Sequence, residues 1–234
     1  MTILGIIPAR IGSKRIPNKN FVKIGSRSLT KIALDQAKNS ELLSEIVVST
    51  DLKNPRQEFD AMDLRYIIKR PDNLCGDLAK GYTYVQHALQ YLRDVKNLEF
   101  EYFVVLPPTA PLRSTKDIDA CIQILLKNDV DSVTSMVEVN QMYNPLKLKT
   151  ITKGRIQPYY EEENGRTAYY ELPKAYVRNC AVYASKVSVL EGESLIGKIC
   201  MPYIMPPERS IDINEPIDLE VARCLVERNS DQWI

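Results

Sequence analysis

The feature that most constrains the fold is an alternation between short, continuous apolar runs and longer segments with helical periodicity. Continuous apolar runs are typical of strands buried on both faces, and their alternation with helices predicts βαβ units. The predicted strands cover residues 3–8, 45–50, 64–71, 102–106 and 131–139, and the predicted helices cover residues 28–38, 55–62, 79–94, 116–127 and 215–228. The sequence therefore predicts an α/β fold with a mostly parallel sheet flanked by helices.

Polar residues before two of these helices favour specific N-caps. Thr115 precedes the helix over residues 116–127, and its hydroxyl can accept a hydrogen bond from the first turn. Asn214 precedes the helix over residues 215–228, where Pro216 is compatible with the first turn. We expect Thr115 and Asn214 to be the N-caps.

With 234 residues, the chain is long enough for one large domain and a small appendage. Residues 140–177 differ from the rest, because prolines and glycines are spread through them and tyrosines are concentrated there. We interpret this segment as an inserted flap with little core of its own, which covers a pocket or binds a second subunit. Residues 1–139 and 178–234 then form a single α/β domain.

A strongly basic loop follows the first predicted strand. The stretch IIPARIGSKRIPNKN, residues 6–20, lacks acidic residues and contains the cations Arg10, Lys14, Arg15 and Lys19. The net charge of the protein is only +1, so this positive charge is local. Loop N–H groups and cationic side chains beyond the carboxyl end of a strand suit a polyphosphate. The loop matches neither the P-loop nor the G-x-G-x-x-G pattern, and a solvated loop, or one that contacts acidic residues of a partner, is the alternative.

Composition argues against several other classes. The five cysteines are scattered without C-x-x-C spacing, which indicates reduced thiols in a cytoplasmic protein and no zinc site. The single histidine, His87, lies in a predicted amphipathic helix, so a histidine-based triad or metal site is hard to build. No apolar run approaches the ~20 residues of a membrane helix. Only Phe21 lies near the basic loop, which argues against nucleic acid as a partner.

Several stretches resemble, in order, the motifs of one enzyme family. They are PAR-x-GSK-R-IP-x-KN at residues 8–20, RPDNLCGD at 70–77, LPPTAPLRS at 106–114, NPLK at 144–147, LPKAYVRNCAVY at 172–183 and RSIDIN at 209–214. The chain is thereby similar to the cytidylyltransferases that make CMP-sialic acid and related CMP-nonulosonic acids. The resemblance implies the Rossmann-like fold of nucleotide-diphospho-sugar transferases, with an inserted dimerisation flap.

The resemblance assigns the first loop to the nucleotide CTP. The residues implied in nucleotide binding are Ala9, Arg10, Ser13, Lys14, Lys19, Asn20, Arg70 and Gly81. Lys19 and Arg10 are expected to stabilise negative charge on the phosphates, and together with Asp212 they form the predicted catalytic set. Catalysis of phosphoryl transfer is mainly positioning and charge neutralisation, for which cationic groups are suited.

The motif RSIDIN implies a Mg²⁺ site, because relatives carry two aspartates there. In this chain the two positions are Asp212 and Asn214. Residues i and i+2 of an extended segment face the same side, so both can face one cation. The amide oxygen of Asn214 is an uncharged ligand, which predicts weaker metal binding, and helix capping is its alternative role. Asp218, in the following helix, is expected to be structural.

The sugar acid carries a carboxylate, so its pocket requires a cation. The residues that the resemblance implies in sugar binding are Lys147, Asn179, Tyr183 and, in place of a missing flap arginine, Arg166. Two positions depart from the family, since Pro107 replaces a ligand-contacting glutamine and Cys180 replaces a glycine. For Arg113, a structural role and a ligand-binding role are both open.

The implied reaction joins CTP to a nine-carbon 2-keto sugar acid of the sialic, legionaminic or pseudaminic type. The anomeric hydroxyl attacks the α-phosphate, pyrophosphate leaves, and Mg²⁺ assists. The expected assembly is a homodimer in which the flap of one subunit closes the sugar pocket of the other. The alternatives are a cytidylyltransferase for the eight-carbon acid Kdo or for a polyol or isoprenoid phosphate precursor, and a non-catalytic nucleotide-binding homologue.

Overall fold

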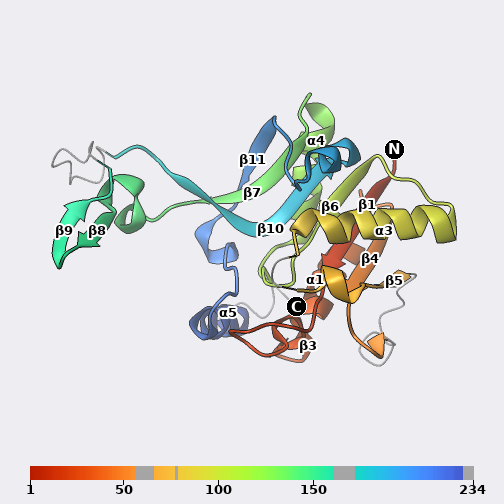
Figure 1. Cartoon of the computed structure of the whole chain (residues 1–234), viewed down its shortest axis with the longest axis horizontal. Coiled ribbons are helices and arrows are strands. Elements are labelled where there is room, and N and C mark those ends of the chain that lie inside the picture. The colour runs from red at the N-terminus through yellow and green to blue at the C-terminus, as the bar shows by residue number, and fades with distance from the viewer. Residues whose placement is uncertain (56–65, 77–78, 161–171, 229–234) are drawn as a thin grey trace.

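The core of the protein is a seven-stranded sheet with helices on both faces (Figure 1). The computed structural model describes residues 1–55, 66–76, 79–160 and 172–228. The order along the sheet is β11 (Cys200–Ile204), β7 (Ser132–Glu138), β10 (Tyr176–Lys186), β6 (Tyr102–Val105), β1 (Ile3–Pro8), β4 (Glu45–Thr50) and β5 (Tyr66–Lys69). Neighbouring strands are parallel except that β10 runs antiparallel to β6 and β7. The predicted α/β fold with a mostly parallel sheet is confirmed.

Among the described residues, three α-helices pack on this sheet through their apolar faces: α1 (Leu29–Lys38), α3 (Gly81–Lys96) and α4 (Thr115–Lys127). A further helix, α5 (Pro216–Arg228), packs beside the sheet, against the start of α1. Successive side chains of a strand face opposite sides, so Ile3 and Ile7 of β1 pack with α1 and α4. Leu4 and Ile6 of the same strand pack with α3 on the other face. The short strands β2 (Lys23–Ile24) and β3 (Arg27–Ser28) form a small hairpin beside the basic loop, and β2 packs with α5.

The start of α4 differs from the predicted cap. Its N-cap is Ser114, and Thr115 is the first residue of the helix. The Ser114 hydroxyl accepts from the Asp117 N–H, while the Asp117 carboxylate accepts from the Ser114 N–H at 2.8 Å. This reciprocal capping box satisfies two N–H groups, which a threonine cap without a carboxylate three residues later would not do.

The start of α5 also corrects a prediction. The helix begins at Pro216, and the Asp218 carboxylate accepts from the N–H groups of Asn214 and Glu215 at 2.9 and 2.8 Å. Asn214 is therefore not the N-cap, and Asp218 has the structural role expected for it. The helix predicted over residues 55–62 lies, beyond its first residue, outside the described residues.

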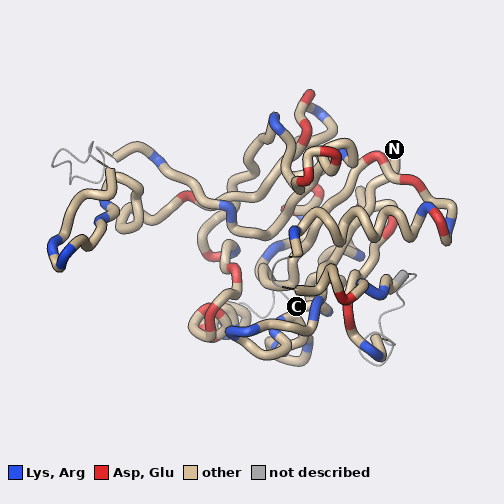
Figure 2. The backbone as a smooth tube through the Cα atoms, viewed as in Figure 1, with Lys and Arg blue, Asp and Glu red and all other residues tan. Residues whose placement is uncertain are grey.

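A thin arm leaves the body of the protein between β7 and β10 (Figure 1). Its described part comprises residues 140–160 and 172–175, and it contains the antiparallel hairpin of β8 (Lys149–Thr152) and β9 (Arg155–Pro158). This hairpin forms a separate two-stranded sheet. Figure 2 shows that the charged residues in the described part of the arm are basic. The chain rejoins the main sheet at Tyr176, which pairs with Glu138 of β7.

The helices and the cysteines have two further properties. Within the ranges that the structure describes, no helix combines the length and the apolarity that crossing a bilayer would need. All five cysteines are free thiols, and Cys121 of α4 lies fully buried in the core. Burial raises the pKa of the Cys121 thiol, so this group is an apolar packing element at neutral pH.

Candidate active site

The basic loop is held at the carboxyl ends of β1 and β4 by hydrogen bonds from its own backbone. The Ala9 N–H donates to the Ser49 carbonyl at 2.9 Å, and the Thr50 hydroxyl donates to the Ala9 carbonyl at 2.6 Å. The Ile11 N–H donates to the Asp51 carboxylate at 2.7 Å. Ala9 is fully buried, so its role in this structure is to anchor the start of the loop.

Asn20 fixes the other end of the loop. Its side chain is buried, and its amide nitrogen donates to the Arg10 carbonyl at 2.9 Å. The Thr30 hydroxyl donates to the Asn20 carbonyl at 2.7 Å. Between these contacts, Asn18 adopts a left-handed φ of 52°, a conformation that asparagine tolerates better than most residues. A loop that is already ordered loses little conformational entropy when a ligand binds.

A first cavity, of about 310 Å³, lies between this loop and α3. The predicted nucleotide residues that line it are Arg10, Ser13, Lys19, Asn20 and Arg70. Of the remaining predicted nucleotide residues, Lys14 is exposed and lines neither this cavity nor the adjoining one, and Gly81 lines only the adjoining one. The fold thus brings together cations from two strand ends that lie far apart in the sequence.

Arg70 is the most deeply buried of these cations. Its Nε donates to the Ser49 hydroxyl at 3.1 Å and its Nη2 donates to the Ser49 carbonyl at 3.0 Å. The guanidinium lies 4.6 Å from the ring centre of Tyr84, a cation–π contact. Burial lowers the pKa of Arg70, although an arginine remains charged at neutral pH. These contacts hold a fixed positive charge at the wall of the first cavity.

Lys19 lies where the first cavity meets a second one. Its ammonium donates to the Ile213 carbonyl at 2.6 Å. Burial lowers the pKa of Lys19, and the neighbouring Asp212 carboxylate acts in the opposite direction. The lysine is therefore directed toward the segment that follows β11, and its charge can contact a ligand in either cavity.

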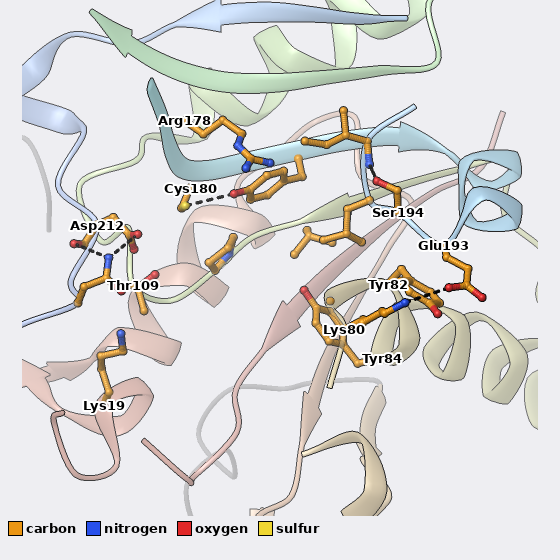
Figure 3. Close-up of a pocket in the computed structure, with 17 residues that line it drawn as sticks. Lys19, Lys80, Tyr82, Tyr84, Thr109, Arg178, Cys180, Glu193, Ser194 and Asp212 are labelled. Carbon is orange, nitrogen blue, oxygen red and sulfur yellow. Dashed lines mark hydrogen bonds and ion pairs between the residues drawn. The ribbon is translucent and has the colours of Figure 1, made fainter. Parts of the chain in front are cut away.

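The second cavity is larger, about 590 Å³, and adjoins the first (Figure 3). The lining residues common to both cavities are Lys19, Tyr84, Pro107 and Thr109. At one end of the second cavity lie Arg178, Cys180 and Asp212, and at the other end Lys80 pairs with Glu193 at 3.1 Å (Figure 3). Two ligands bound side by side would meet at the shared wall.

The β10 strand is irregular where it lines the second cavity. Its pairing with β7 shifts register between Arg178 and Tyr183, and Cys180 within this bulge has a φ of 56°. A left-handed backbone explains why the resembled motif has glycine at this position, since a Cβ there is strained. The Tyr183 hydroxyl donates to the Cys180 sulfur at 3.2 Å. Burial is the main cause of a raised pKa at both groups, so the pair is uncharged at neutral pH.

Asp212 and Asn214 lie beside each other at the edge of the second cavity, with the Asn214 amide nitrogen 2.8 Å from the Asp212 carboxylate. Across the described residues, no group of three or more His, Cys, Asp and Glu side chains could hold a metal. Mg²⁺ commonly takes only one or two carboxylates from the protein and completes its shell with phosphates and water. The pair fits such an ion only if the Asn214 amide rotates to present its oxygen.

The predicted sugar-binding residues do not all line the second cavity. Asn179 is buried and donates to the Ser210 hydroxyl at 2.9 Å, which ties β10 to the segment after β11. Lys147 follows the buried Asn144 in the arm and lines neither cavity of this chain. Arg166 lies outside the described residues. Of the predicted set, Tyr183 is the residue that lines the second cavity.

Arg113, whose role the sequence left open, is structural. The residue is fully buried, and burial lowers its pKa to about 10. Its Nη1 donates to the carbonyls of Ala181 at 2.6 Å and Pro107 at 3.3 Å, and its Nη2 donates to the Gln36 amide oxygen at 2.9 Å. One guanidinium thereby joins the loop that contains Pro107 to the β10 bulge.

Sequence reasoning missed several residues of the site, among them Tyr84, Thr109 and Arg178. Tyr84 lies one helical turn after Gly81 on α3, so the expected position of Gly81 could have pointed to it. Thr109 lies within the PPTAPLR loop, and Arg178 directly precedes the NCAVY stretch. Both lie inside stretches that resemble the family motifs, and this was the available signal.

The protein has an α/β fold with a cavity lined by cations at the carboxyl ends of its strands. A second cavity, with the Asp212 carboxylate at its edge, adjoins the first. That arrangement suits nucleotidyl transfer. The chain belongs to the cytidylyltransferase family, whose model matches residues 4–191. The predicted family and the predicted cytidylyltransferase activity are confirmed.

Several relatives match nearly the whole chain, among them the following three. The post-translational flagellin modification protein B of Campylobacter coli is 29% identical over 98% of this chain and 97% of the relative. The N-acylneuraminate cytidylyltransferase of Escherichia coli is 29% identical over 99% of this chain, which spans 54% of that protein. The pseudaminic acid cytidylyltransferase of Campylobacter jejuni is 28% identical over 99% of both chains.

The fold is shared with solved structures of more distant proteins. A CMP:2-keto-3-deoxy-manno-octonic acid synthetase complexed with CTP superposes with a TM-score of 0.69 and covers 97% of this chain and 99% of that chain. Its sequence identity is 16%, so this likeness shows the fold alone.

Proposed function

We propose that this enzyme transfers CMP from CTP to the anomeric hydroxyl of a nine-carbon 2-keto sugar acid and releases pyrophosphate. The names of two relatives, a pseudaminic acid and an N-acylneuraminate cytidylyltransferase, support this class of acceptor. The observation that carries the proposal is the pair of adjoining cavities with Lys19 at their junction. Two anionic reactants need neighbouring sites, and the charge that develops between them needs a cation.

The first cavity suits the nucleotide. Arg10, Ser13 and Arg70 present two cations and a hydroxyl to a triphosphate, and the Arg10 guanidinium is itself held by the Cys75 carbonyl at 2.9 Å. Lys19 would then contact the α-phosphate. The hydroxyl oxygen of the acceptor forms the new bond to the α-phosphorus, the bond from that phosphorus to pyrophosphate breaks, and the hydroxyl proton is released.

The second cavity suits a sugar acid with apolar substituents. Its wall includes the side chains of Tyr82, Leu195 and Ile196. Gly81 leaves room there, since a Cβ at that position would come within 3.2 Å of Leu195. The methyl groups of N-acyl substituents gain from contact with such surfaces, which favours an N-acylated acid over an unsubstituted one.

Asp212 and Asn214 are the residues that would hold Mg²⁺. When bound, the ion supplies positive charge to phosphate oxygens. The proximity of Lys19 to this pair supports a shared role, because the lysine and the carboxylate edge face the same junction.

We further propose a cytoplasmic homodimer formed through the arm. The arm exposes large apolar side chains, with Ile151 and Ile156 of the hairpin 77% and 73% exposed, and Met142 and Tyr143 64% and 61% exposed. Large apolar side chains that are exposed together on one segment indicate a protein–protein interface. In the dimer, Lys147 of one subunit reaches the sugar of the other. Sedimentation should give a dimer mass for the unaltered chain and a monomer mass after Ile151→Asp with Ile156→Asp.

The test of function is pyrophosphate release from purified protein with Mg²⁺. CTP is offered with N-acetylneuraminic acid, a di-N-acyl legionaminic acid, a di-N-acyl pseudaminic acid and Kdo, and each acid is also offered with UTP and ATP. We expect turnover with CTP and at least one nine-carbon acid, together with a matching CMP-sugar by mass spectrometry.

Two outcomes would point elsewhere. Turnover confined to Kdo, or to a polyol or isoprenoid phosphate precursor added to the panel, would move the enzyme to another acceptor class. Heat of CTP binding by calorimetry, without pyrophosphate release from any acceptor at any Mg²⁺ concentration, would make the protein a nucleotide-binding homologue that does not catalyse.

A further inference from the structure

Arg178 is a cation in the second cavity that was not among the predicted site residues, although it lies inside the stretch LPKAYVRNCAVY. It lies on β10, opposite Met136 of β7, and is the last residue paired with β7 before the bulge. Figure 3 shows its guanidinium directed into the cavity, on the side where Cys180 and Asp212 lie. The strand register therefore gives this arginine a defined place in the wall of the cavity.

The guanidinium of Arg178 makes no hydrogen bond or ion pair with any residue in the described part of the chain. Other arginines around the site are engaged: Arg10 binds a carbonyl, Arg70 binds Ser49, and Arg113 binds three oxygen atoms. The Arg178 side chain is exposed to solvent in the cavity, so its charge is hydrated and carries no burial penalty. An arginine in this state can offer two parallel N–H donors to a planar anion.

Arg178 directly precedes Asn179 on β10, and the Asn179 side chain is buried. Because successive residues of a strand face opposite sides, the Arg178 guanidinium lies on the other face of β10 from the Asn179 side chain. That face is the one that lines the second cavity.

We propose that Arg178 binds the carboxylate of the sugar acid and thereby orients its anomeric hydroxyl toward Lys19 and Asp212. This inference rests on the proposed function. In a 2-keto sugar acid the carboxyl carbon is bonded to the anomeric carbon, so an anchored carboxylate leaves the hydroxyl only a short distance away. Cys180, which couples electrostatically to both Arg178 and Asp212, lies between the two charged ends of this arrangement.

The other cation of the cavity is a weaker candidate. Lys80 lies at the opposite end and is already paired with Glu193 at 3.1 Å. An acid anchored there would lie on the side of the cavity away from Asp212, whereas Arg178 lies on the side of Asp212 (Figure 3). Lys80 is consequently the competing candidate with which the test compares Arg178.

The test measures steady-state kinetics with the preferred acid for the unaltered enzyme, Arg178→Gln, Arg178→Lys and Lys80→Gln. We expect Arg178→Gln to raise KM for the acid about ten- to a hundredfold, the loss of a hydrogen-bonded charge contact. Arg178→Lys should recover part of this loss. Lys80→Gln should raise KM for the acid less than Arg178→Gln does, and a larger rise would assign the carboxylate to Lys80 and overturn the proposal. The dissociation constant of CTP, by calorimetry, should be unchanged in all three.

A second arm identifies the group that Arg178 binds. In the carboxamide analogue of the acid the carboxylate is replaced. With the unaltered enzyme, this analogue should raise KM as much as Arg178→Gln raises KM for the acid. With Arg178→Gln, KM should be no higher for the analogue than for the acid. Additive losses, or an unchanged KM in Arg178→Gln, would overturn the assignment while leaving the proposed function intact. No turnover of any acid by the unaltered enzyme would refute the proposed function, and the role of Arg178 with it.

Discussion

Replacing Arg113 by methionine removes the buried guanidinium that connects the two halves of the site. The substitution keeps an unbranched side chain of considerable length but takes away every donor. The acceptors left behind are the carbonyls of Ala181 and Pro107 and the amide oxygen of Gln36. Ala181 and Pro107 belong to the β10 bulge and to the loop beside both cavities, so the change acts on stability and on site geometry together.

The magnitude follows from these contacts. A buried acceptor that loses its partner costs about 1–3 kcal/mol. Part of that cost is offset, because the variant no longer holds a desolvated charge inside the protein. We expect the free energy of unfolding to fall by about 3 kcal/mol, which corresponds to a decrease in Tm of roughly 6–12 °C for a chain of this size.

Urea titration and thermal unfolding, each followed by circular dichroism, measure the effect. The control is Arg93→Met on α3, an exposed arginine whose nearest carboxylate is Glu99 at 3.9 Å, and its change should stay below about 0.5 kcal/mol. Arg113→Lys should lie between the two, because it keeps the charge and loses the planar fork. If Arg113→Met destabilised the protein no more than the control does, the guanidinium would not be the connection described above.

Three further predictions concern the site and its surroundings. Lys19→Met should lower kcat/KM about 30- to 1000-fold, since one charge at the phosphates is worth roughly 2–4 kcal/mol. The control is Lys23→Met, an exposed position, whose kcat/KM should be near normal. Equal kcat/KM values in the two variants would remove Lys19 from the mechanism. Cys180→Gly should raise the free energy of unfolding by about 1 kcal/mol, because it relieves a left-handed residue, and an unchanged urea midpoint would contradict this. Burial lowers the pKa of His87 in the folded state, so the unfolded chain binds more protons below the ordinary value of 6.5 and stability is lost as pH falls from there toward the lowered pKa. Since His87 is the single histidine, His87→Gln should reduce the loss of unfolding free energy between pH 6.5 and the lowered pKa of His87. An identical dependence of unfolding free energy on pH in the variant and the unaltered protein would contradict this prediction.

Five strands of the main sheet, the helices α1, α3, α4 and α5 and part of the first cavity could be predicted because they depend on local patterns, whereas the strands β10 and β11 were not predicted. Apolar runs are decided within a few residues, and a parallel sheet brings the carboxyl ends of its strands to one edge. Arg10 after β1 and Arg70 after β5 could therefore be expected near each other, and both line the first cavity. The caps of α4 and α5 were misassigned, because Asp117 and Asp218 compete with the predicted capping side chains from inside the helix.

The sequence by itself determined the α/β class, the basic loop and, through its motifs, the cytidylyltransferase family, because each of these depends on residues that are close together in the sequence. Only the tertiary structure decided that Arg113 is a buried connector and that Arg178 lines the second cavity. The partners of Arg113 lie 68 and 77 positions away, at Ala181 and Gln36. The side on which Arg178 emerges depends on its pairing with β7 and on the bulge that follows. Contacts over such separations exist only after the chain has packed, so no local pattern records them.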